Sequence, residues 1–188
     1  MRISISGPPG SGKTTVCVLV AKKLECEHIL IGQIFRQLAT ERGVNLETFG
    51  RLAEEDETID KELDKRMLAI AASKEDIVLE GRLTGALLRS RKVPVFAIYV
   101  DADERVRAQR IAQREGANPE DVLKQIRKRE RSERKRYKAF YGIDPSDRTL
   151  YDLWLDSSNT PAEALADTIL AEVKRARSSH VDKGEKGD

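Results

Sequence analysis

The chain has 188 residues, of which 39% are hydrophobic and 35% are Asp, Glu, Lys or Arg, and its formal net charge is +2. This length suits one domain with a sizeable core, and no run reaches the roughly eighteen apolar residues of a membrane-spanning helix. The N-terminus leads directly into a strand pattern, so we expect no signal peptide and a cytoplasmic protein.

A glycine-rich stretch close to the N-terminus dominates the sequence. It fits the phosphate-loop pattern G-x-x-x-x-G-K-[ST], since it reads Gly7, Pro8, Pro9, Gly10, Ser11, Gly12, Lys13 and Thr14. An apolar strand pattern at 2–6 precedes it and a helical pattern at 16–24 follows. Backbone N–H groups of such a loop surround an anion at a helix N-terminus. Lys13 is then expected to reach the β- and γ-phosphates, and Thr14 to ligate magnesium.

The next part of the chain reads as a mostly helical insertion between two strands. His28 opens a short apolar strand at 28–31, and a helix follows to about Arg42. Asn45 is expected to cap the next helix. The spacing of the apolar residues predicts two helical stripes. The first stripe is Leu46, Phe49, Leu52 and Ala53, and the second, in a helix over about 58–72, is Ile59, Leu63, Met67 and Ile70.

Three further apolar runs, at 77–80, 94–100 and 151–156, read as strands, and a helix is expected from Pro161 to about Lys174. Strands alternating with helices indicate an α/β fold with a parallel sheet covered on both faces. From Arg177 the chain is polar and rich in Gly, Lys and Glu, so a disordered tail is expected.

Glu80 ends the strand at 77–80, and ligands of parallel sheets bind at the carboxyl ends of strands. A carboxylate there can hold the water shell of magnesium, which is the reading we favour. The structural alternative is a buried salt bridge with Arg82.

The charge is unevenly distributed. Residues 47–65 contain eight acidic and three basic side chains, whereas residues 103–141 contain thirteen basic and seven acidic ones. On the first basic helix, Arg107, Arg110 and Arg114 share a face. On the second, the stripe Val122, Ile126, Arg129, Glu133 and Arg136 changes from apolar to charged. Such arginines can clamp phosphates, or they can form exposed ion pairs with glutamates.

Cys17 and Cys26 do not form a CxxC pair, and with two histidines they make no recognisable zinc spacing. Both are interpreted as reduced, packed thiols. His28 and His180 are interpreted as residues without a catalytic role.

Four motifs together resemble the nucleoside monophosphate kinases, and among them the cytidylate kinases of the archaeal type. They are the loop 7–14, Gly32 to Arg36 with the pattern GxxxR, Glu80-Gly81-Arg82, and the Arg129 to Arg136 segment, with 151–158 resembling that family's last strand and adenine loop. The resemblance covers about residues 1–176. It implies a P-loop nucleoside triphosphate hydrolase-type five-stranded parallel sheet with helices on both faces, a helical monophosphate-binding lobe and a short lid.

The resemblance also implies boundaries and roles. The core would comprise 1–32, 73–111 and 137–176, the lobe about 33–72 and the lid about 112–136. Lys13, Arg110, Arg129 and Arg136 would be catalytic, residues 7–15 from Gly7 to Thr15 would bind ATP, and Thr14 and Glu80 would hold Mg²⁺. Arg36, Arg82 and Glu133 would bind the acceptor nucleotide, CMP.

The chain departs from the bacterial members of that family at two positions. Leu83 stands where they have Asp, and Ile31 where they have Ser. Cytosine must therefore be read by other groups, and the acidic insertion offers Asp56 and Asp60. A carboxylate accepting from the cytosine amino group would discriminate against uracil.

The expected activity is ATP-dependent phosphorylation of CMP and dCMP by a monomer, without nucleic-acid or membrane partners. One alternative is a P-loop kinase for UMP, AMP or another small acceptor. The other is a nucleic-acid-binding ATPase that uses the basic helices, although few aromatic residues lie among their charges.

Overall fold

The computed structural model describes residues 1–184. Its centre is a five-stranded, wholly parallel sheet of order β2-β3-β1-β4-β5. The strands are β1 (Arg2–Ser6), β2 (Glu27–Leu30), β3 (Ile77–Gly81), β4 (Phe96–Asp101) and β5 (Leu153–Asp156). The predicted α/β class is confirmed. Four strands start or end one or two residues away from the predicted limits; in β2 this is because Ile31 begins a helix instead of ending the strand.

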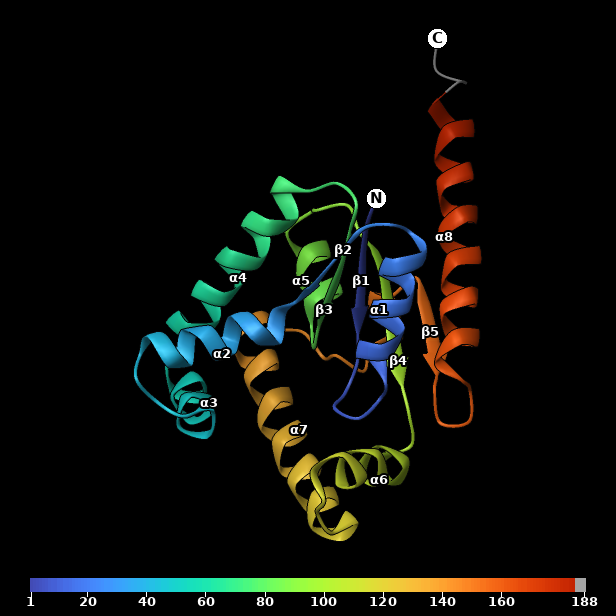
Figure 1. Cartoon of the computed structure of the whole chain (residues 1–188). Helices are drawn as coiled ribbons and strands as arrows, with labels where there is room; N and C mark the ends of the chain where they lie inside the picture. Colours follow the sequence, from blue (N-terminus) through green and yellow to red (C-terminus); the bar gives the residue numbers. More distant parts are fainter. Residues whose placement is uncertain (185–188) are drawn as a thin grey trace.

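Helices cover both faces of the sheet (Figure 1). On one face, α1 (Lys13–Lys23) and α8 (Ala162–Gly184) pack over alternate strand residues such as Ile5, Val78 and Ile98. On the other face, Leu79 and its neighbours pack against four helices, which are α2 (Ile31–Glu41), α4 (Glu57–Ser73), α5 (Thr84–Ser90) and the end of α7 (Pro119–Tyr141). Burial on both faces explains why the strands read as continuous apolar runs.

A helical lobe stands between β2 and β3. It consists of α2 (Ile31–Glu41), α3 (Leu46–Glu55) and α4 (Glu57–Ser73). Its small core contains Leu38, Ala39, Phe49, Ala53 and Ile59. The predicted cap is confirmed, because Asn45 Oδ1 accepts a hydrogen bond from the Thr48 N–H at 2.8 Å. The first predicted stripe is half wrong, since Leu46 and Leu52 are exposed.

The two basic helices form a hairpin beyond the carboxyl end of β4 (Figure 1). They are α6 (Glu104–Glu115) and α7 (Pro119–Tyr141). Asp103 and Asn118 cap their N-termini, and Gly116 and Gly142 end them with positive φ angles. The hairpin has a core of its own, made by Ala108, Ile111, Ala112, Val122, Leu123 and Ile126.

Two features differ from the sequence-based expectations. A short helix, α5 (Thr84–Ser90), follows β3 where none was predicted. The last helix, α8, continues to Gly184, so the stretch from Arg177 to Gly184 is helical instead of disordered. The final four residues of the expected tail lie outside the described residues. Among residues 1–184, no helix is long and apolar enough to cross a membrane.

Candidate active site

The glycine-rich loop joins the carboxyl end of β1 to the N-terminus of α1, as predicted. Gly10 and Gly12 have φ angles of 78° and 76°, which favour glycine. A Cβ at Gly10 would lie 2.7 Å from the Arg107 carbonyl oxygen, too close for any side chain. The loop therefore keeps this shape only with glycine at these positions.

Lys13 lies in the first turn of α1, and its Nζ donates to the Pro8 carbonyl oxygen at 3.0 Å. Burial, followed by the positive charge of Arg82, lowers the pKa of Lys13 from 10.5 to about 7. Glu80 and Glu133 oppose this decrease. Lys13 therefore lies close to Arg82, Glu80 and Glu133, which are also predicted site residues.

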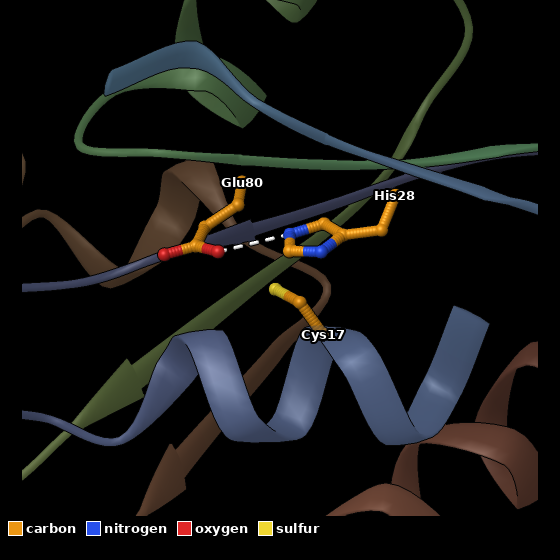
Figure 2. Close-up of side chains that lie close together, drawn as sticks. All are labelled: Cys17, His28 and Glu80. Carbon is orange, nitrogen blue, oxygen red and sulfur yellow. Dashed lines mark hydrogen bonds and ion pairs between the residues drawn. The ribbon is translucent and has the colours of Figure 1, made fainter. Parts of the chain in front are cut away.

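Glu80 holds two neighbours with its two carboxylate oxygens. Thr14 Oγ1 donates to Glu80 Oε1 at 2.6 Å. His28 Nε2 lies 2.9 Å from Glu80 Oε2, and Figure 2 shows this second contact. Burial opposes ionisation of Glu80, yet the hydrogen bonds from His28 and Thr14 and the charge of Lys13 keep its pKa below the usual value. The alternative pairing of Glu80 with Arg82 is wrong, since Arg82 pairs with Glu133.

The contact of His28 with Glu80 was not expected from the sequence, in which His28 was interpreted as a residue without a catalytic role. The contact exists because β2 lies beside β3, with His28 opposite Val78 and Leu30 opposite Glu80. The sequence does show a histidine two residues before the end of a strand. It could not indicate a contact with Glu80, because that contact depends on the order of the strands in the sheet.

Two arginines of α6 fix the loop. Arg107, almost fully buried, donates to the carbonyl oxygens of Ala102 and Pro9 and forms an ion pair with Glu130 of α7. Arg110 donates to the Gly10 carbonyl oxygen, and more closely to Ser157 at its hydroxyl and carbonyl oxygens.

These contacts divide the arginine face predicted on this helix. Arg107 and Arg110 reach the loop, whereas Arg114 is exposed and pairs with Glu115. Arg107 was not among the predicted site residues, although it shares the face of Arg110.

A network of ion pairs lies on α7 and its neighbours. Glu133 Oε1 accepts from Arg129 Nε at 2.9 Å, and Glu133 Oε2 lies 3.6 Å from Arg82 Nε. Burial favours the neutral acid, but Arg82, Arg129 and Arg136 keep the pKa of Glu133 below its usual value. Arg136 Nε lies 3.1 Å from Asp60 Oδ2 of α4. Predicted residues from three elements are thus brought together here.

The two remaining acceptor-binding candidates lie elsewhere in the helical lobe. Arg36 is exposed on α2, beside an open depression that Gln33 and Thr40 also line. Asp56 is exposed and caps α4, because its carboxylate accepts from the Thr58 N–H at 2.9 Å. Neither residue joins the ion-pair network of α7, and their binding roles stay predictions.

A cavity of about 200 Å³ connects the loop to this network. Gly7 and Pro8 line it on one side, and Arg82 and Glu133 on another. The stacked rings of Tyr99 and Trp154, with centroids 4.0 Å apart, complete part of the wall; both were overlooked because their strands read simply as buried. The cavity therefore presents charged side chains of both signs next to an aromatic surface.

The strand order, the glycine loop at the N-terminus of α1 and the Glu80 carboxylate near the end of β3 define a P-loop nucleotide-binding fold, with an arginine-rich network of ion pairs beside it. Comparison with known proteins places the chain more narrowly. It belongs to the cytidylate kinase-like family, whose model matches residues 2–159.

Two curated relatives and one solved structure illustrate the similarity. The cytidylate kinase of Halobacterium salinarum is 44% identical over 170 residues, which cover 90% of this chain and 88% of the relative. The cytidylate kinase of Archaeoglobus fulgidus is 41% identical over 179 residues, 94% and 98% of the two chains. Shikimate kinase from Acinetobacter baumannii shares the fold, with a TM-score of 0.62 at 19% identity over 93% of each chain. The family and fold predictions are confirmed.

Proposed function

We propose that the protein transfers the γ-phosphoryl group of ATP to the phosphate of CMP or dCMP, giving ADP and CDP or dCDP. A phosphate oxygen of the acceptor forms a bond to the γ-phosphorus, while the bond from that phosphorus to the β–γ bridging oxygen breaks. The observation that carries the proposal is the cavity where the phosphate loop meets Arg82 and Glu133, in a chain similar to cytidylate kinases over most of its length.

At the ATP end, residues 7–15 supply backbone N–H groups and the Lys13 ammonium to the phosphates. A bound polyphosphate favours the charged amine, so ATP should raise the pKa of Lys13 from about 7. Arg110 links Gly10 to Ser157, and we assign to it the alignment of the two loops that surround ATP. We also propose a direct catalytic role for Arg110, as the resemblance implies.

The cation is proposed to be Mg²⁺. The Thr14 hydroxyl and Glu80 carboxylate are hard oxygen donors of the kind it prefers, and they lie 2.6 Å apart beside the loop. The residues therefore fit the ion, which when bound would neutralise charge on the β- and γ-phosphates.

At the acceptor end, Arg36 and Arg82 are proposed to hold the CMP phosphate, while Arg129 and Arg136 neutralise charge on the transferred group. Guanidinium groups suit this task because they bind phosphate oxygens in pairs. The acceptor is already ionised, so alignment and charge neutralisation suffice and no strong base is needed. Glu133 orients Arg82 and Arg129 in the free protein.

Asp56 and Asp60 are proposed to recognise the cytosine ring, as in the sequence-based prediction. Residues 33–72 form the proposed acceptor lobe and 112–136 the proposed lid, with the remaining segments up to 176 as the core. Closure of these parts would exclude water and prevent hydrolysis of ATP. The proposal includes a cytoplasmic monomer.

The experiment that tests the function measures ADP formed from ATP and Mg²⁺ with CMP, dCMP, UMP, AMP or GMP as the sole acceptor. We expect CMP and dCMP to be strongly preferred. Equal ADP formation with and without every nucleotide would contradict the kinase proposal, and preference for another nucleotide would contradict the assigned acceptor.

A further inference from the structure

Cys17, His28 and Glu80 meet at one point although they belong to three elements. Cys17 comes from the second turn of α1, His28 from β2 and Glu80 from the end of β3 (Figure 2). Their sulfur, imidazole nitrogen and carboxylate oxygen atoms all lie within 4.8 Å of one another. Cys17 and Glu80 are buried and His28 is partly buried, so the three donor atoms form a cluster that is largely shielded from solvent.

The donor types point to a particular class of cation. Thiolate, imidazole and carboxylate are the three ligand types that Zn²⁺ uses in proteins, whereas Mg²⁺ prefers oxygen ligands alone. Three protein ligands with a fourth position for water is a common arrangement for zinc. The spacing of the residues in sequence does not indicate a metal site, because the fold alone brings them together.

We propose that Cys17, His28 and Glu80 form a binding site for Zn²⁺, and that zinc bound there inhibits the kinase by occupying the Glu80 carboxylate. The thiol proton of Cys17 leaves to solvent on binding, since the thiolate is the ligand. The inhibitory half rests on the proposed function, because it depends on the role assigned to Glu80 beside Thr14.

Inhibition follows from the way in which Glu80 is shared. In the free protein one carboxylate oxygen accepts from Thr14 and the other lies 2.9 Å from His28. A zinc ion between Cys17 and His28 replaces the contact of His28 with Glu80 and attracts the carboxylate toward the thiol. Thr14 then loses its hydrogen-bond acceptor, the Glu80 carboxylate, beside the phosphate loop.

The first experiment needs no nucleotide. The reduced, full-length protein is titrated with CoCl₂ as a spectroscopic substitute for zinc, and Zn²⁺ affinity is measured by competition with a chelating dye. We expect saturation at one metal per chain, with a thiolate-to-cobalt charge-transfer band. Cys17→Ala should abolish the band and weaken zinc binding by at least about tenfold. His28→Gln should weaken it similarly.

Cys26→Ala is the matched control, because Cys26 is the other free thiol and lies outside the cluster. It should retain the band and the zinc affinity of the unmodified protein. Absence of a thiolate band in the unmodified protein overturns the site, even if Cys17→Ala fails to fold. Binding by Cys17→Ala as tight as that of the unmodified protein also overturns it.

The second experiment measures ADP chromatographically, without coupling enzymes, during turnover with saturating Mg²⁺ and added ZnCl₂. Zinc should inhibit the unmodified protein and Cys26→Ala, reversibly on chelation, and should spare Cys17→Ala. Equal inhibition of all three overturns the inhibitory half. If the zinc-free protein shows no nucleotide turnover, the proposed function fails, whereas the metal site is still judged by the cobalt spectrum.

Discussion

The loop side of the site and the α7 side hold their charged groups by different means. On the loop side, Lys13 is held by a backbone carbonyl oxygen, and Thr14 by a buried carboxylate. On the α7 side, arginines pair with acidic side chains, as Arg136 does with Asp60. Backbone and strand ends are fixed by the fold, whereas long side chains can exchange an acidic partner for a phosphate at little cost in geometry.

This difference indicates that the proposed ATP end is preformed, and that the charges of the proposed acceptor end are balanced by ion pairs in the free protein. In the free protein, Glu133 pairs with Arg82 and Arg129, and Asp60 pairs with Arg136. These three arginines are the ones proposed to bind phosphates. A ligand that displaces these carboxylates must compensate for breaking partly buried ion pairs, so part of its binding energy is used in the exchange. Mutations on the two sides should therefore have unequal effects.

The largest effect is expected on the loop side. Replacement Lys13→Ala should lower kcat by about 10²–10³-fold, because a preorganised charge at the transferred phosphoryl group is lost. Steady-state ADP formation with saturating ATP and CMP measures this. Lys22→Ala, at an exposed position in the last turn of the same helix, should have nearly normal kcat. Normal turnover by Lys13→Ala would show that the loop does not take part in the reaction.

A smaller effect is expected in the acceptor lobe. Replacement Arg36→Ala should lower kcat/KM for CMP by about 10–100-fold, the worth of a charged hydrogen bond to phosphate, and leave the KM for ATP unchanged. Initial rates with each substrate varied in turn measure this separation. Arg51→Ala, exposed on α3, is the control. Unchanged CMP kinetics in Arg36→Ala would remove this residue from the proposed acceptor site.

The smallest effect concerns stability at the contact between α4 and α7. Burial raises the pKa of Asp64 to about 6, although a hydrogen bond from Tyr141 opposes the shift. Its contribution to stability is therefore complete below the usual pKa of 3.8 and is lost as the pH rises through about 6. Asp64→Asn should be more stable than the unmodified protein by about 1–2 kcal/mol at pH 8.

Urea unfolding of the two proteins at pH 4 and pH 8 measures this difference. The advantage of Asp64→Asn should disappear at pH 4, where both side chains are neutral in the folded protein. A difference in the free energy of unfolding that is the same at pH 4 and pH 8 would show that ionisation of Asp64 does not destabilise the folded protein. A difference found only at pH 8 would mean that a buried charged group at the contact between α4 and α7 destabilises the folded protein.

The loop side could be predicted from the sequence because its pattern is local. Lys13 and Thr14 follow from eight consecutive residues, and Glu80 follows from its position at the end of an apolar run. The partners of these residues could not be predicted in the same way. Arg82 is paired with Glu133, 51 positions later in the sequence, and that contact depends on how α7 crosses the end of the sheet.

Two helices show other limits of pattern analysis. The helix α5 has only seven residues, and five of them are buried, so it has no polar face from which a period could be recognised. The end of α8 is polar and also lacks a stripe, yet a helix that is already packed elongates more easily than a new one nucleates. Arg177 further fixes it, because its guanidinium donates to Asp76 at 3.1 Å.

The central place of β1 has a consequence for how the protein is made. β1 is synthesised first, but its neighbours are β3 and β4, so Ile3 pairs with Val78 and Phe96. Until the ribosome has released β3, the first strand has no partner, and it has both of its neighbours only once β4 has also been released. Such distant parallel pairings also slow folding. The nascent chain therefore carries its phosphate-loop sequence from the outset, but the strand before this loop is flanked on both sides only from about the middle of translation.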